Sequence, residues 1–78
     1  MVTVLRAEGV RVVIFSNDHQ PAHVHVFIGG GEAKIDLMPG SITLVWAKGM
    51  SRAEIRTAVR IVGEHQVSLI QRWSEIHG

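Results

Sequence analysis

Apolar and polar residues alternate over several short stretches in the first half of the chain, and glycines separate these stretches. Alternation with a period of two residues is typical of a strand that buries one face. The connections are too short for the crossovers that parallel strands need, so the strands are expected to run antiparallel. The predicted strands cover Thr3 to Ala7, Arg11 to Ser16, His23 to Ile28, Glu32 to Leu37 and Ile42 to Trp46.

The pattern becomes helical in the last third of the chain. Ser51 and Glu54 have the spacing of a capping box, in which each side chain binds the backbone amide of the other residue. Apolar residues then recur in steps of three and four, which predicts a helix from Arg52 to His77. Such a helix would be about 39 Å long, whereas a compact chain of this length is about 30 Å across. We therefore expect it to kink near Gly63, to overhang the sheet, or to pack against a second copy in a homodimer.

Together these elements predict an α+β fold. An antiparallel β-meander of four to five strands occupies residues 1–47, and a long C-terminal helix over residues 51–77 covers one face of the sheet.

Composition narrows the class of protein. The chain has 78 residues, 46% hydrophobic and 19% charged, which favours one folded domain over residues 1–78. The absence of cysteine excludes disulfides and thiolate metal sites. The net charge of +1 is too small for a general polyanion-binding protein. No stretch approaches the roughly 20 apolar residues of a membrane span, and the N-terminus lacks a signal-peptide pattern. We expect a cytoplasmic protein with no membrane partner.

Imidazoles and carboxylates are concentrated near the central hairpin. Asp18 and His19 lie in the loop before the third strand, and His23 and His25 share one face of that strand with Phe27. We expect this face to be exposed to solvent, because the opposite face carries the apolar residues.

The alternation also predicts the register of the hairpin. Both apolar faces must meet the helix, so the numbers of two paired residues must add up to an odd value. The shortest register of this kind places His25 opposite Asp36, with Cβ atoms around 5 Å apart. A shift of two residues would place His25 opposite Lys34 or Met38.

Three interpretations of the histidines remain open. In the first, His25, oriented by Asp36, and His23 exchange protons in metal-independent RNA cleavage, with no cofactor, while His19 or Lys34 stabilises the phosphate. In the second, His19, His23 and His25 bind zinc or nickel and leave one coordination position open. In the third, the histidines are polar residues of an exposed sheet face.

Basic residues on the predicted helix are a further candidate for phosphate binding. Arg52, Arg56 and Arg60 recur every four residues and form a basic ridge. This ridge would position an RNA strand, and Asn17, in the loop, joins the candidate substrate-binding residues.

Four parts of the sequence have a familiar pattern: Thr3-Val4-Leu5, the run from Ser16 to Val26, the segment Gly31 to Ile35, and Trp73. In these parts the chain resembles a family of small bacterial proteins called domain of unknown function 4160. The resemblance covers nearly the whole chain, although Ala22 stands where the family pattern commonly has a second proline.

The resemblance implies a family signature made of Asn17, Asp18, His19, Pro21, His23 and His25. Members are often encoded beside another small protein, an arrangement similar to toxin–antitoxin operons, and no catalytic activity follows from the likeness. Our leading hypothesis is that the chain is a component of a toxin–antitoxin-like pair. We favour the toxin role over the antitoxin role, and we expect the protein to act on RNA and to bind a small cognate protein encoded nearby. The alternatives are a non-enzymatic module that binds such a partner and a histidine-based metal-binding regulator.

Overall fold

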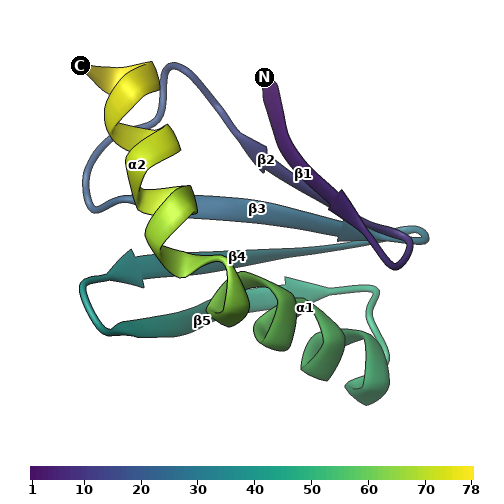
Figure 1. Ribbon diagram of the computed structural model, residues 1–78. Helices are drawn as coiled ribbons and strands as arrows, with labels where there is room; N and C mark the ends of the chain where they lie inside the picture. The colour runs from purple at the N-terminus through teal and green to yellow at the C-terminus, as the bar shows by residue number, and fades with distance from the viewer.

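The computed structural model describes residues 1–78 and has one antiparallel sheet with two helices on one side (Figure 1). The strands lie in the sheet in chain order, β1-β2-β3-β4-β5. The predicted α+β class and antiparallel meander are therefore confirmed. The elements are β1 (Val2–Ala7), β2 (Val10–Ile14), β3 (His23–Ile28), β4 (Gly31–Met38), β5 (Ser41–Lys48), α1 (Arg52–Glu64) and α2 (Gln66–His77).

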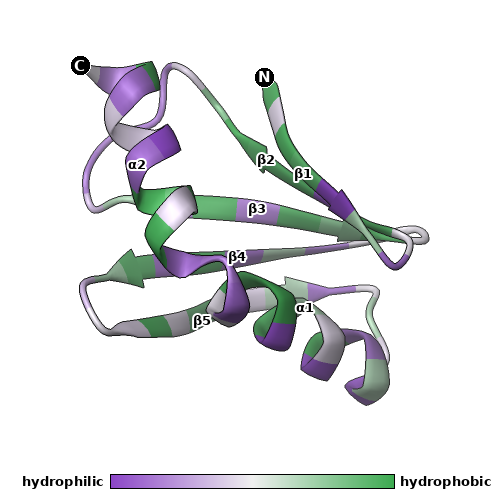
Figure 2. Cartoon of the chain, in the orientation of Figure 1, coloured by the Kyte–Doolittle hydropathy of each residue, from purple (hydrophilic) through white to green (hydrophobic).

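The hydrophobic core lies between the helices and the face of the sheet turned toward them, which we call the inner face. α1 packs against β3, β4 and β5, whereas α2 packs against β4 and α1. Figure 2 shows the hydrophobic residues of α1 on the side nearer the sheet and its hydrophilic residues on the far side. The opposite face of the sheet is called the outer face below. The buried core residues are Val10, Val12, Ile14, Val24, Val26, Ile35, Leu37, Ala58, Ile61, Val62, Leu69 and Trp73.

The helical segment is divided in two, so the expected single long helix is not observed. His65 has φ −111° and ψ 17°, which lies outside the helical range and separates α1 from α2. The break is two residues after Gly63, where a kink was one of the predicted alternatives, and both halves fit within a molecule of 34 × 25 × 20 Å. Neither helix is both long enough and apolar enough to cross a membrane.

The predicted capping box at the start of α1 is confirmed. The hydroxyl of Ser51 accepts a hydrogen bond from the backbone amide of Glu54 at 3.1 Å, and the Glu54 carboxylate accepts one from the Ser51 amide at 2.8 Å. Two amides that have no partner within the helix are satisfied in this way. The N-terminus of α2 lacks a side-chain cap of this kind.

In the central hairpin, the numbers of two paired residues add up to an odd value, as predicted. The pairing itself differs from the predicted one by two residues. His25 lies opposite Lys34, and Asp36 lies opposite His23, so the predicted pairing of His25 with Asp36 is wrong. The cause is the loop: Gly29, at φ 55°, and Gly30 form the turn, while Gly31 is the first residue of β4.

The first position of β4 has no room for a side chain, so glycine fits there. A Cβ atom there would overlap the side chain of Met50 and the backbone of Gly49, both of which follow β5. The close approach of these two backbone segments fixes the shorter loop and therefore the register.

Candidate functional site

The two histidines of β3 are covered rather than exposed to solvent. His23 is only 5% exposed and packs against Trp73 of α2, with ring centroids 5.0 Å apart. The side chain of His25 is 13% exposed, and its ring meets that of Phe15 edge-on at 4.7 Å. The prediction of a solvent-exposed histidine face is therefore wrong, because the segment that follows β2 and the end of α2 cover this end of the sheet.

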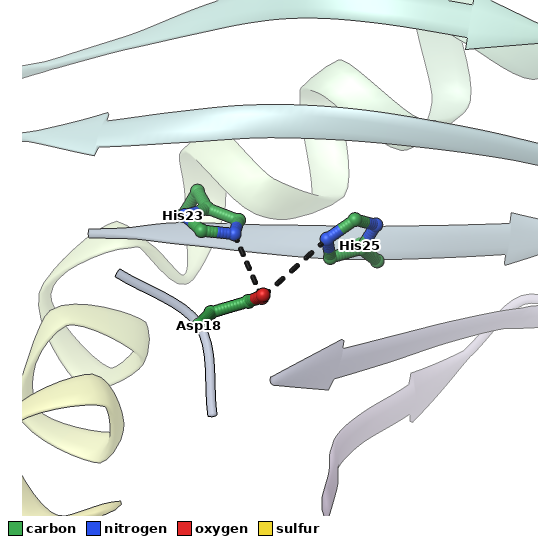
Figure 3. A group of neighbouring side chains, drawn as sticks. All are labelled: Asp18, His23 and His25. Atoms are coloured by element: carbon green, nitrogen blue, oxygen red, sulfur yellow. Dashed lines mark hydrogen bonds and ion pairs between the residues drawn. The ribbon is translucent and has the colours of Figure 1, made fainter. Parts of the chain in front are cut away.

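Asp18 lies between the two imidazoles, as Figure 3 shows. Its Oδ2 atom is 2.8 Å from Nε2 of His23 and 3.6 Å from Nε2 of His25. A turn after β2, closed by a hydrogen bond from the Asp18 amide to the Phe15 carbonyl, points this carboxylate back toward β3. Residues from a loop and a strand therefore converge on one point.

The remaining ring nitrogen of each histidine has its own acceptor. Nδ1 of His23 lies 2.9 Å from the carbonyl oxygen of Pro21, and Nδ1 of His25 lies 3.0 Å from Oε2 of Glu32. Both oxygens accept hydrogen bonds, so both Nδ1 atoms carry the donated hydrogen. In the neutral rings, the two Nε2 atoms then present lone pairs to Asp18.

This arrangement requires a proton or a metal ion between the three groups. Two nitrogen lone pairs and a carboxylate oxygen that face one another repel unless protons on Nε2 or a metal ion lie between them. The three ligand atoms of Asp18, His23 and His25 all lie within 4.8 Å of one another. Two imidazoles and one carboxylate are a common ligand set for divalent transition metals. We call these three residues the His–Asp cluster.

The other predicted site residues lie outside the His–Asp cluster, some of them next to its histidines and some of them exposed in the loop. His19 and Asn17 are both exposed, and His19 is not among the clustered ligand groups. Lys34 faces His25 across the β3–β4 ladder, where Asp36 was expected. Asp36 faces His23, and its buried Oδ1 atom has no hydrogen-bond partner.

The basic ridge lies on α1, which packs on the inner face, whereas the histidines project from the outer face. Arg60 forms salt bridges with Glu8 at 2.7 Å and with Glu64 at 3.2 Å. The hydrogen bond that Arg60 donates to the Glu8 carboxylate is the main reason why the pKa of the exposed Arg60 guanidinium is raised above its usual value. Arg52 and Arg56 are exposed and form no ion pair. The structure therefore does not bring the ridge and the histidines to one site.

Two carboxylates of the site were not among the predicted catalytic residues. Asp18 precedes His23 by five residues, and only the fold of the loop places its side chain on β3. Glu32 reaches His25 diagonally across the ladder, since its direct partner is Phe27. Glu32 and Asp36 both lie on the polar face of β4, and the register of the hairpin determines which of them reaches His25.

Comparison with known proteins identifies a family for this chain. Its sequence model matches residues 9–74, which include β2 to β5, α1 and most of α2. The matched region contains the His–Asp cluster together with Glu32. Comparison with the curated proteins and with the solved structures gave no match. The chain belongs to the family described as Domain of unknown function (DUF4160), as the resemblance of its sequence predicted.

Proposed function

We propose that the chain is a metal-binding protein whose His–Asp cluster holds one divalent transition ion. The observation that carries this proposal is the anchoring of both Nδ1 atoms, by Pro21 and by Glu32, which leaves both Nε2 atoms directed at Asp18. Metal-binding histidines characteristically donate their other N–H to a carbonyl or carboxylate, which fixes the tautomer and the ring orientation. Here both histidines have such a partner.

The ligand types favour zinc, with nickel as the alternative. Imidazole nitrogen suits both ions, whereas magnesium and calcium prefer sites made only of oxygen. Three protein ligands leave a fourth position of a tetrahedral zinc ion for water or another ligand. The Asp18 side chain is 27% exposed, so the open position would lie on its side of the cluster.

A bound ion would also tie the loop to the sheet. Asp18 belongs to the segment between β2 and β3, while both histidines belong to β3. An ion that binds all three residues stabilises the folded chain, because this set of ligands does not exist in the unfolded state. We propose that the protein works as a metal-dependent regulator in the cytoplasm, where the ion fixes this loop for a small cognate protein.

The proposal is tested by calorimetric titration of zinc into protein stripped of metal by a chelator. We expect one ion per chain, and at least about a tenfold loss of affinity in Asp18→Asn, which keeps the size of the side chain. His19→Gln is the matched comparison, because His19 is exposed and lies outside the cluster. Equal binding by Asp18→Asn and the parent protein, or a loss only in His19→Gln, would contradict this ligand set.

Metal-independent RNA cleavage by a toxin is the second candidate. Both ring nitrogens of His25 face carboxylates, and Lys34 lies opposite it, so proton transfer and phosphate binding have candidate residues. Against this candidate, the two surface hollows of the molecule lie at the α1–α2 junction and beside Glu8, and neither is lined by His23 or His25.

The two candidates make opposite predictions for a chelator. A toxin of this kind would cut RNA in excess EDTA and arrest bacterial growth when expressed, and His25→Ala would abolish both effects. A protein that neither cuts RNA nor arrests growth would exclude the toxin candidate, and the metal proposal would be unaffected.

A further inference from the structure

The outer face of the sheet carries all the basic residues of the five strands. Arg6 and Arg11 lie on β1 and β2, and Lys34 and Lys48 lie on β4 and β5; the pairing places each of them on the same face as Phe27 or His25. None of the four forms a salt bridge, whereas Arg60 and Arg72 of the helices do. Four cations of the sheet are therefore free to bind an anion from outside the chain.

One pair of these cations is placed unfavourably for the chain on its own. Arg6 and Arg11 are direct partners in the β1–β2 ladder. Like charges in this position destabilise a sheet, and no carboxylate of the chain compensates them with a salt bridge. A bound anion would relieve this repulsion.

Two aromatic rings share the face, and a cation covers each of them. The guanidinium of Arg11 lies 5.0 Å from the centroid of the Phe27 ring, and the ammonium of Lys48 lies 4.8 Å from the Trp46 ring. Both rings are half-buried. Long basic side chains can move aside, so each ring becomes a flat surface with a positive charge at its border.

The strands place two carboxylates on this face, those of Glu32 and Asp36 on β4. Glu32 accepts a hydrogen bond from His25, and Asp36 lies opposite the buried His23. Glu32 lies between Phe27 and Lys48 in the ladders, so the four cations outnumber the two carboxylates of the face, and the edge formed by Arg6 and Arg11 has no acid as a direct ladder partner.

We infer that this outer face binds single-stranded nucleic acid. Bases stack on Phe27 and Trp46, and phosphates bind Arg6, Arg11, Lys34 and Lys48; these six residues are called the basic–aromatic face. An acidic peptide would use the cations but not the rings, whereas a nucleotide supplies both a flat base and an anion. A duplex keeps its bases stacked inside and cannot use the rings.

The spacing of the two rings suits a short oligonucleotide. Phe27 and Trp46 belong to β3 and β5, two strands or about 9.6 Å apart across the sheet, and the register offsets them by two residues, about 6.8 Å, along it. A single strand that reaches both rings and the four cations requires several nucleotides, and an octamer lies within the site size of about 4–16 nucleotides of comparable surfaces.

The test is fluorescence anisotropy with a labelled octamer in excess EDTA. The arms are 2′-O-methyl RNA, which cannot be cleaved through its 2′-hydroxyl, single-stranded DNA, and a DNA duplex of the same length. We expect both single strands to bind more tightly than the duplex, and any difference between them to identify RNA or DNA as the preferred form. The plot of log K against log salt should have a slope of about −2.8, the value for four phosphate contacts.

Substitutions locate the binding on the face. Phe27→Leu and Trp46→Leu keep an apolar side chain and should each weaken binding by about 5-fold to 150-fold, the range for one base stack. Arg6→Gln/Lys48→Gln should reduce the slope by about 1.4. Arg52→Gln/Arg56→Gln removes the same charge from α1 and should leave both quantities unchanged. Circular dichroism of each variant confirms that it is folded.

Three results would overturn the inference. One is the absence of binding at about 100 μM protein, the weak end of non-specific binding. The second is equal affinity for duplex and single strands. The third is a reduction of the salt slope by Arg52→Gln/Arg56→Gln that is as large as the reduction by Arg6→Gln/Lys48→Gln. If the first result comes with unchanged folding, the basic–aromatic face would be a protein-binding surface instead. Because EDTA is present throughout, none of these results depends on the proposed metal site.

Discussion

His25 and Glu32 are joined by a hydrogen bond of 3.0 Å between Nδ1 and Oε2, although they are not direct partners in the β3–β4 ladder. The bond is diagonal, and it fixes the orientation of an imidazole whose other nitrogen faces Asp18. In the metal proposal, Glu32 touches no ion but determines which nitrogen of His25 is available.

Glu32→Leu removes the acceptor of the His25 hydrogen bond and is therefore expected to weaken zinc binding by about 10- to 100-fold, the range for loss of such a hydrogen-bond partner. Asp36→Asn removes the same charge from the same face of β4, but Asp36 has no hydrogen bond to a histidine. Its effect on the zinc affinity should be clearly smaller. If calorimetry gives equal losses for both variants, the effect is one of net charge, and the positioning role of Glu32 is wrong.

Gly31→Ala is expected to destabilise the fold by about 1–3 kcal/mol, the usual range for overpacking. The new Cβ would overlap Met50 and the backbone of Gly49. Gly30→Ala is the matched control, since a Cβ there meets nothing within 4 Å. Urea denaturation of both variants measures the difference in the free energy of unfolding. Equal stabilities would show that Gly31 does not fix the hairpin register.

Gln66 connects the start of α2 to the β4–β5 turn. Its side-chain amide donates hydrogen bonds to the carbonyl oxygens of Met38 and of Ser41, the latter at 2.7 Å. Gln66→Leu leaves both carbonyls without this partner and should lower the free energy of unfolding by about 1 kcal/mol. Gln71→Leu makes the same chemical change at an exposed position without a hydrogen bond, and thermal unfolding should detect little change. The role of Gln66 would be refuted by equal melting temperatures of the two variants.

The capping box gives a prediction for α1. Ser51→Ala removes the hydroxyl that accepts from the Glu54 amide and should cost about 1 kcal/mol of stability. Ser74→Ala, at an exposed position within α2, should change it by no more than about 0.5 kcal/mol. Chemical denaturation distinguishes the two, and a destabilisation of Ser74→Ala as large as that of Ser51→Ala would contradict the capping role.

Much of the fold could be predicted because it depends on local patterns. Alternation on β3 and β4 shows which residues face the helices, and short connections make the strands antiparallel. The capping box sets the start of α1. The division at His65 could be anticipated only as a kink, because its position depends on how α1 and α2 pack against the sheet.

The register and the site geometry depend on contacts between residues far apart in the sequence. The requirement that both apolar faces meet the helices excludes half of the registers of the central hairpin. The exact pairing depends on Gly31 lying against Gly49. That pairing decides which carboxylate reaches His25. The cover over His23 comes from Trp73, fifty residues later in the chain, so a pattern within β3 could not reveal it.

The most direct test of the metal proposal is the visible absorption spectrum of the protein titrated with Co²⁺, which replaces zinc at its sites and reports its ligand geometry. We predict one equivalent of Co²⁺ with the intense absorption of a four-coordinate ion, displaced by zinc and lost in Asp18→Asn. A spectrum that stays that of the hydrated ion throughout the titration would contradict the His–Asp cluster as a metal centre.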